Sequence, residues 1–173
     1  MKLLYQVYGM SVLMYDSVAW YTPTLTVQKK LMTFHRSFWR LATGAVRNEN
    51  FRWIYTIPET VKDPIEVAEM ADLTFFYKCY FRIYDCIPID NFIQFTESRH
   101  GRITRHRIRK INLGHLEEIP SKTKVHQHSF FKRAIHLWNL IEPEDKQKGL
   151  AHFKEAAEKL VRRRKFERPY HLQ

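Results

Sequence analysis

The chain has 173 residues, of which 45% are hydrophobic and 14% aromatic. This length suits one domain, or one domain with a tail. The apolar content is high enough to bury a core, which excludes a wholly disordered chain. The 29 Lys and Arg outnumber the 18 Asp and Glu, which gives a formal charge of +11. Because such a field attracts polyanions, nucleic acid is the first candidate partner and an anionic membrane surface the second.

Cys79 and Cys86 are the two cysteines of the chain. On a helix, a spacing of seven places them on one face about two turns apart, which is too far for a disulfide bond. We therefore expect two buried, reduced thiols and a reducing compartment, the cytoplasm and/or the nucleus.

An apolar stretch at residues 3–21 opens the sequence. Polar residues such as Gln6 and Asp16 interrupt it, whereas a membrane span needs about 20 clean apolar residues. Its apolar positions surround the helix, which predicts a central buried helix and no membrane partner. Residues 17–19, Ser-Val-Ala, have a weak likeness to a signal-peptidase site, so a secreted basic protein with a cleaved N-terminus is an alternative.

A second helix is predicted at residues 25–42. Thr24 or Thr26 is expected to cap its start, and Gly44 is expected to end it. Apolar residues recur along it at helical spacing, and a stripe of cations follows the opposite side. This stripe is the first candidate nucleic-acid contact, with a merely solvated face as the alternative: Lys29, Lys30, Arg36 and Arg40.

The next stretch is mixed, and residues 45–63 are expected to form a short helical or irregular segment. Asp63 followed by Pro64 predicts the start of a long helix. We expect this helix to run to about Cys86 and to end before Pro88. Residues 89–95 are expected to form a short further helix.

The composition changes near Ser98. Residues 98–135 contain ten Lys or Arg but only two Glu. They predict an extended basic loop, with room for a small β-hairpin about residues 112–114, and a disordered basic linker is the alternative. Cations of this loop form the second set of candidate nucleic-acid contacts: Arg99, Arg102, Arg105, Arg107, Arg109 and Lys110.

Two more helices are predicted, at residues 127–141 and 150–165, with a stop at Pro143 between them. The aromatic residues between Phe131 and Trp138 are assigned to the core. The last helix ends in a third set of candidate phosphate contacts, Arg162, Arg163 and Arg164. The alternative is that these cations only interact favourably with the helix dipole.

The expected fold is mainly α, a helical bundle of about five to six helices with a long basic loop. The expected division is a helical core at residues 1–97, a basic loop or linker at 98–126, and a C-terminal helical pair with a basic tail at 127–173.

Catalytic and metal-binding patterns are missing from the sequence. The five glycines are well separated and form no phosphate loop, and neither H-E-x-x-H nor CxxC zinc spacing occurs. Polymerase chemistry needs clustered carboxylates to hold two metal ions about 4 Å apart, but the aspartates are scattered singly. We expect no catalytic residue, no metal, no cofactor and no small-molecule ligand, so this chain alone is not expected to be an enzyme.

Three blocks of sequence follow one another in a fixed order. The first includes Tyr15-Asp16-Ser17-Val18-Ala19-Trp20, then Val27-Gln28-Lys29-Lys30, and closes with Arg40-Leu41-Ala42-Thr43-Gly44. The second is Asp72-Leu73-Thr74-Phe75-Phe76-Tyr77-Lys78. The third is Ser129-Phe130-Phe131-Lys132-Arg133, continued by Trp138-Asn139 and then Phe153-Lys154. In this order and spacing they resemble the segment after the polymerase core of reverse transcriptases from non-LTR (LINE-like) retrotransposons.

The resemblance covers residues 4–161, and it implies a parent protein that performs RNA-directed DNA synthesis. It departs from the family pattern at Lys132 and Glu142, where the family usually has Pro. Counterparts of the fingers and palm, with the catalytic aspartates, are missing, as is a zinc knuckle. The resemblance therefore implies a non-catalytic, thumb-like C-terminal fragment whose partners are the parent's upstream polymerase domains and template RNA or RNA–DNA duplex.

Such a fragment would grip RNA or DNA through backbone phosphates, with little sequence preference. A different class stays open at this point. The chain is also compatible with a helical protein-interaction module that has no nucleic-acid function and whose cations are only surface residues.

Overall fold

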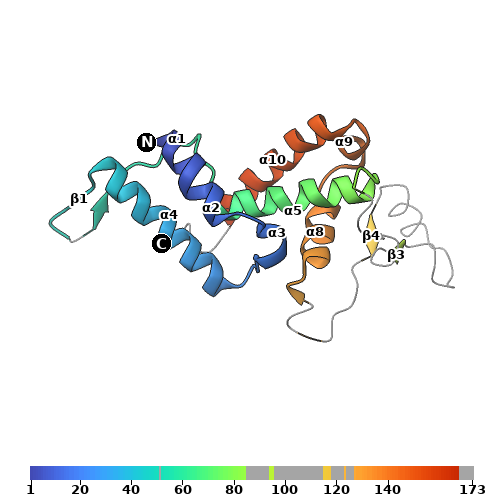
Figure 1. Cartoon of the computed structure of the whole chain (residues 1–173), viewed down its shortest axis with the longest axis horizontal. Coiled ribbons are helices and arrows are strands. Elements are labelled where there is room, and N and C mark those ends of the chain that lie inside the picture. Colours follow the sequence, from blue (N-terminus) through green and yellow to red (C-terminus); the bar gives the residue numbers. More distant parts are fainter. Residues whose placement is uncertain (51, 85–93, 96–114, 118–122, 124–126, 168–173) are drawn as a thin grey trace. The chain divides into compact units, whose positions relative to one another are not determined.

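The computed structural model describes residues 1–50, 52–84, 94–95, 115–117, 123 and 127–167. This part of the chain is mainly helical, with two small antiparallel sheets of two strands each (Figure 1), which confirms the predicted fold class. Contacts divide the chain into two units, residues 1–68 and 69–173. The division lies inside α5 (Pro64–Tyr80) and not near residue 97, because the second half of this helix packs on the C-terminal helices.

The first unit begins with a broken helical segment. Its parts are α1 (Lys2–Leu4), the π-helical η1 (Tyr5–Met10), α2 (Ser11–Leu13) and α3 (Ser17–Trp20). Asp16, with a φ of 50°, interrupts the segment before α3. Tyr5, Met10 and Met14 are buried, whereas Val12 is 78% exposed and Tyr8 is exposed too. The predicted central burial is therefore wrong, because only one side of the segment meets the rest of its unit.

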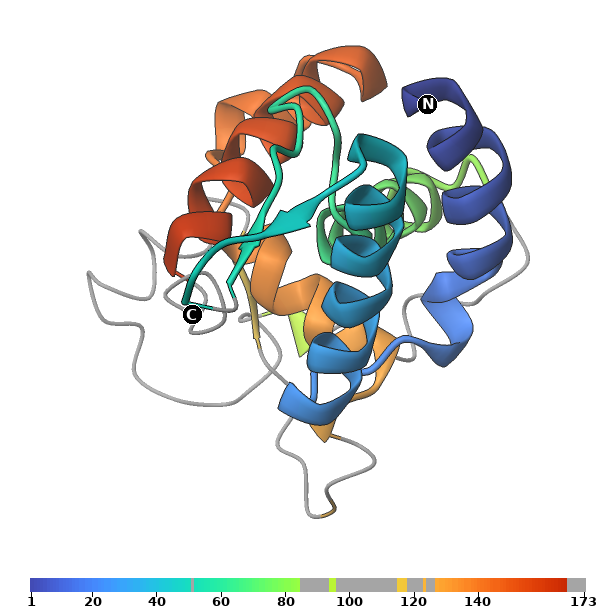
Figure 2. The same ribbon diagram turned by 90° about the vertical axis from the view of Figure 1, so that its left-hand side faces the viewer.

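Helix α4 (Leu25–Thr43) has the predicted bounds to within a residue, and it lies beside the N-terminal segment (Figure 2). Thr24 is at the N-cap position, although its side chain makes no capping hydrogen bond. Gly44 ends the helix as predicted. Its φ of 62° is the left-handed conformation that glycine adopts without steric cost, and the next amide, of Ala45, donates to the Arg40 carbonyl at 2.9 Å.

A β-hairpin follows α4, where a helical or irregular segment was predicted. Its strands are β1 (Val46–Arg47) and β2 (Trp53–Ile54), and Arg47 pairs directly with Trp53. Asn48 organises the connection: its Oδ1 accepts from the amide of Asn50 at 3.1 Å and from that of Arg52 at 2.8 Å. Asparagine suits this role because its short side chain mimics a backbone turn.

The start of α5 confirms the sequence prediction and adds a reciprocal cap. Asp63 Oδ1 accepts from the amides of Ile65 and Glu66, at 2.9 and 2.8 Å, and Glu66 Oε2 accepts from the Asp63 amide at 2.7 Å. The predicted end near Cys86 is wrong. The helix ends at Tyr80, and Arg82 then adopts a left-handed φ of 53°. Cys86 lies outside the described residues, whereas Cys79 is buried as predicted.

The second unit combines the rest of α5 with α8 (Phe130–Asn139), α9 (Pro143–Gln147) and α10 (Leu150–Glu167) (Figure 1). Helix α8 begins three residues later and ends two residues earlier than predicted, and Pro143 starts a short further helix. Aromatic rings fill the core, as predicted for Trp138. Its ring lies 5.2 Å from that of Phe76 and 5.5 Å from that of Phe153, between centroids.

A second strand pair joins β3 (Gln94–Phe95) to β4 (Leu116–Glu117). The predicted helix at 89–95 is therefore wrong at its last two residues, and its other residues lie outside the described part. Asn139 fixes β4 with two hydrogen bonds of 2.9 Å, one to the amide and one to the carbonyl of Leu116. The predicted hairpin at 112–114 and most of the predicted basic loop at 98–126 also lie outside the described residues.

Candidate nucleic-acid interface

The first predicted set of cations lies on α4. Lys29 and Lys30 are exposed, whereas Arg36 and Arg40 are half-buried. Within the described residues, neither lysine ammonium has a hydrogen-bond or ion-pair partner. Both charges are therefore exposed, and no carboxylate of the described ranges pairs with them. The buried residues of α4 are Leu31, Met32, His35 and Trp39.

The N-terminal segment holds the buried face of α4 in place through Tyr5. The Tyr5 ring lies 4.7 Å from that of Phe38 and 5.5 Å from that of Trp39, between centroids, and its hydroxyl hydrogen-bonds to His35 Nδ1. Burial, with a smaller effect from the charge of Asp63, raises the pKa of Tyr5. The phenol therefore stays protonated and can donate to the imidazole.

Arg40, near the end of α4, contacts aromatic rings of the hairpin and of the residue that follows it. Its guanidinium carbon lies 5.4 Å from the centroid of the Trp53 ring and 5.6 Å from that of Tyr55. Arg47, opposite Trp53 in the hairpin, places its guanidinium carbon 4.7 Å from the same tryptophan ring. The hairpin thus holds two arginines against two aromatic rings. We call these four residues the hairpin cluster: Arg40, Arg47, Trp53 and Tyr55.

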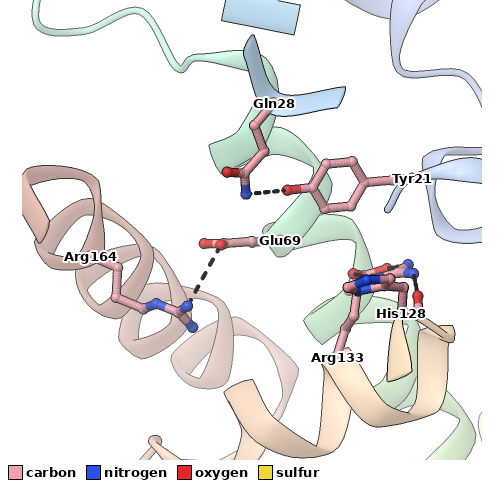
Figure 3. Close-up of polar contacts among 7 residues, drawn as sticks. Tyr21, Gln28, Glu69, His128, Arg133 and Arg164 are labelled. Atoms are coloured by element: carbon pink, nitrogen blue, oxygen red, sulfur yellow. Dashed lines mark hydrogen bonds and ion pairs between the residues drawn. The ribbon is translucent and has the colours of Figure 1, made fainter. Parts of the chain in front are cut away.

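The third predicted set, at the end of α10, is partly neutralised. Arg162 pairs with Glu158 at 2.8 Å, and Arg164 lies 4.0 Å from Glu69 Oε1 (Figure 3). Arg163 is exposed and has no ion-pair partner within the described ranges. This set belongs to the second unit, whereas the α4 set belongs to the first.

The second predicted set, from Arg99 to Lys110, lies outside the described residues. The sequence therefore predicted the exposed cations on α4, but it did not indicate that Arg47, Trp53 and Tyr55 would gather near Arg40. The sequence does contain a signal for this hairpin: in the run from Val46 to Tyr55, residues that favour β-strands flank an Asn-Glu-Asn turn. Each strand is only two residues long, which is too short for a clear alternation of polar and apolar residues.

Two of the three blocks that carry the family resemblance, the second and the third, meet in the second unit. Arg133 of the third block forms two hydrogen bonds with the carboxylate of Asp72 in the second block, at 2.9 and 3.0 Å. The side chains are 7% and 1% exposed, respectively. A third bond of 2.7 Å joins the Arg133 guanidinium to the carbonyl of His128 (Figure 3). These block residues therefore have a structural role, because they join α5 to α8.

Burial also perturbs two ionisable groups of this unit. It raises the pKa of Asp72 to about 6, against the opposing hydrogen bonds and charge of Arg133. At neutral pH the carboxylate is still ionised, so the pair is intact. Burial lowers the pKa of Lys146 to about 8, while its ammonium lies 5.1 Å from the centroid of the Trp138 ring. Lys146 Nζ has no hydrogen-bond partner among the described residues.

No three His, Cys, Asp or Glu side chains of the described ranges are grouped so that they could hold a metal ion. No helix there has the length and apolar content that crossing a bilayer requires. Comparison of the sequence with protein-family models and with curated proteins, and of the fold with solved structures, gives no significant match.

Proposed function

We propose that this chain is a non-catalytic nucleic-acid-binding module, derived from the region after the polymerase core of a non-LTR retrotransposon reverse transcriptase. The observation that carries the proposal is that several cations of the first unit have no carboxylate partner within the described residues. Lys29 and Lys30 project from α4, and Arg40 and Arg47 lie at its end. The proposed ligand is template RNA or RNA–DNA duplex, and the proposed location of the protein is intracellular.

Unpaired cations favour this function on energetic grounds. A lysine that is already bonded to a carboxylate must break that bond before it can neutralise a phosphate. In the part of the chain that the structure describes, Lys29 and Lys30 have no such bond to break, so a phosphate contact releases condensed counterions without that cost. Contacts of this kind fix position on the backbone and provide no base specificity.

The proposed origin rests on the three blocks and on how two of them interact. Asp72 and Arg133 are 61 positions apart, yet they form a buried bidentate pair. Substitution of one member of such a pair leaves the other as an uncompensated buried charge, which favours the retention of both residues within a family. In this proposal the parent's upstream domains perform the DNA synthesis, and this module binds the nucleic acid without a cofactor or metal of its own.

A helical protein-interaction module is the second candidate, and the exposed apolar side of the N-terminal segment favours it. Leu3, Tyr8, Val12 and Tyr15 are all exposed there. Large exposed apolar residues that cluster on one element mark interaction surfaces more often than isolated ones do. The upstream domains of the parent protein are the partner that this candidate would bind.

Binding of the full chain to a labelled RNA–DNA duplex, measured by fluorescence anisotropy at 50 mM salt, tests the proposal. The variant Lys29→Gln/Lys30→Gln should weaken binding clearly. A matched control, Lys154→Gln/Lys159→Gln, removes two charges of α10 that are also exposed and should change the affinity less than twofold. Failure of the wild-type chain to bind, or equal losses in both variants, would contradict a specific role for α4.

A further inference from the structure

We propose that the hairpin cluster is a site for an unpaired nucleotide, in which the arginines bind a phosphate and the exposed Trp53 ring stacks on a base. This inference rests on the proposed nucleic-acid function and deepens it, because it assigns single-stranded RNA or DNA to one particular surface. The cluster comprises Arg40, Arg47, Trp53 and Tyr55.

The arginines of the cluster retain their hydrogen-bonding capacity. Within the described residues, neither Arg40 nor Arg47 has an ion pair, and the buried Nε of Arg40 lacks a hydrogen-bond partner. A guanidinium over an aromatic ring interacts through its face, which leaves the N–H groups at its edge for an anion. The fork of N–H donors matches two oxygens of a phosphate.

Acidic residues do not offset this charge. Glu49, in the connection between the strands, is the one carboxylate in residues 46–55. It is exposed and forms no ion pair within the described part of the chain. The hairpin connection contributes a further cation, Arg52, whose amide is bonded to Asn48 while its side chain is exposed. Local charge therefore favours an anionic ligand.

The tryptophan makes the site selective for single strands. Trp53 is 39% exposed although two guanidinium groups lie over its ring, so part of this residue still faces solvent. An unpaired base can stack on such a ring, or on the guanidinium plane beside it, whereas the bases of a duplex are already stacked on each other. The face of the strand pair opposite Trp53 holds only the apolar Val46 and Ile54.

The hairpin is held firmly enough to present these groups in one arrangement. Asn48 makes two hydrogen bonds across the connection, and its own amide donates to the Arg52 carbonyl at 2.9 Å. The cross-strand contact of Arg47 with Trp53 and the contact of Arg40 from α4 fix the ring from two elements. A ligand therefore loses little free energy to ordering the site.

The test compares a single-stranded RNA with a blunt RNA–DNA duplex of equal phosphate number, both bound to the full chain. Trp53→Ala should weaken single-strand binding about tenfold, as expected for loss of one stacked base. It should change duplex binding less than twofold. Trp53→Phe keeps a ring and should recover most of the loss, while the matched control Ile54→Ala, on the other face of the same strand, should have no effect.

A second measurement needs no substitution. Wild-type protein should bind a strand with abasic positions several-fold more weakly than a base-bearing strand of the same length, because only the stacking is lost. Equal affinity for both strands, or equal effects of Trp53→Ala on single strand and duplex, would overturn the inference and leave the proposed function standing. Absence of binding to either nucleic acid would overturn both.

Discussion

The ion pair between Asp72 and Arg133 gives the most direct prediction about stability. Its side chains are 1% and 7% exposed, and two hydrogen bonds of 2.9 and 3.0 Å join them. Arg133→Met removes one partner and leaves the carboxylate buried without its counter-charge. Loss of one member of a buried pair typically costs about 3–5 kcal/mol, which corresponds to a fall in Tm of roughly 6–20 °C for a chain of this size.

Replacement of both partners should be far less damaging. Asp72→Leu/Arg133→Met leaves no stranded charge, so we expect it to recover most of the stability that either single variant loses. Urea unfolding followed by circular dichroism would give the four free energies of a double-mutant cycle. Arg162→Met is the matched control. It removes the same side chain from an exposed pair with Glu158, where the expected loss is at most about 1 kcal/mol.

Two results would refute this reasoning. One is a loss below about 1 kcal/mol for Arg133→Met, since a desolvated charge cannot be stranded so cheaply. The other is additivity in the cycle, with the double variant as unstable as the sum of the singles. Either result would mean that the α5–α8 contact is maintained by the surrounding aromatic rings alone.

Three further predictions concern single side chains. Lys146→Met should raise the free energy of unfolding at pH 7 by about 1–3 kcal/mol, measured in urea, because an ammonium without a hydrogen-bond partner is no longer buried. Because the pKa of Lys146 is lowered to about 8 from its ordinary value of 10.5, the folded chain loses this proton at a lower pH than the unfolded chain does. Wild-type stability should therefore rise from pH 8 towards 10.5, where the unfolded chain still holds the proton, and the variant should lack this rise. Asp63→Ala should cost about 1–2 kcal/mol through loss of the α5 cap, and a change within error would contradict it. Tyr5→Phe should cost about 1–3 kcal/mol by removing the buried hydrogen bond between the Tyr5 hydroxyl and His35 Nδ1, and an unchanged Tm would contradict a stabilising role for this bond.

Local signals made several elements predictable from the sequence. Gly44 ends α4, and Asp63 with Pro64 starts α5, because each of these residues acts on the backbone next to it. The end of α5 lacked such a signal. Arg82 adopts a left-handed conformation that arginine rarely favours, so the helix ends where no glycine or proline marks it.

Contacts between distant residues could not be predicted. The Asp72–Arg133 pair and the approach of Arg40 to Trp53 depend on how separate elements pack, and neither has a local sequence pattern. Burial of the N-terminal segment was overestimated for a similar reason. Apolar residues on all sides of a helix indicate the surfaces that can be buried, but a partner must be present to cover each of them.

Salt dependence of binding to an RNA–DNA duplex tests the central claim most directly, because counterion release has a defined slope. Between 50 and 200 mM salt, the logarithm of the association constant of the wild-type chain should fall linearly with the logarithm of salt concentration. Lys29→Gln/Lys30→Gln should make that slope shallower by about 1 to 2, because each lost phosphate contact removes about 0.9. A wild-type affinity that is independent of salt, or a slope that the double variant leaves unchanged, would contradict phosphate binding by α4.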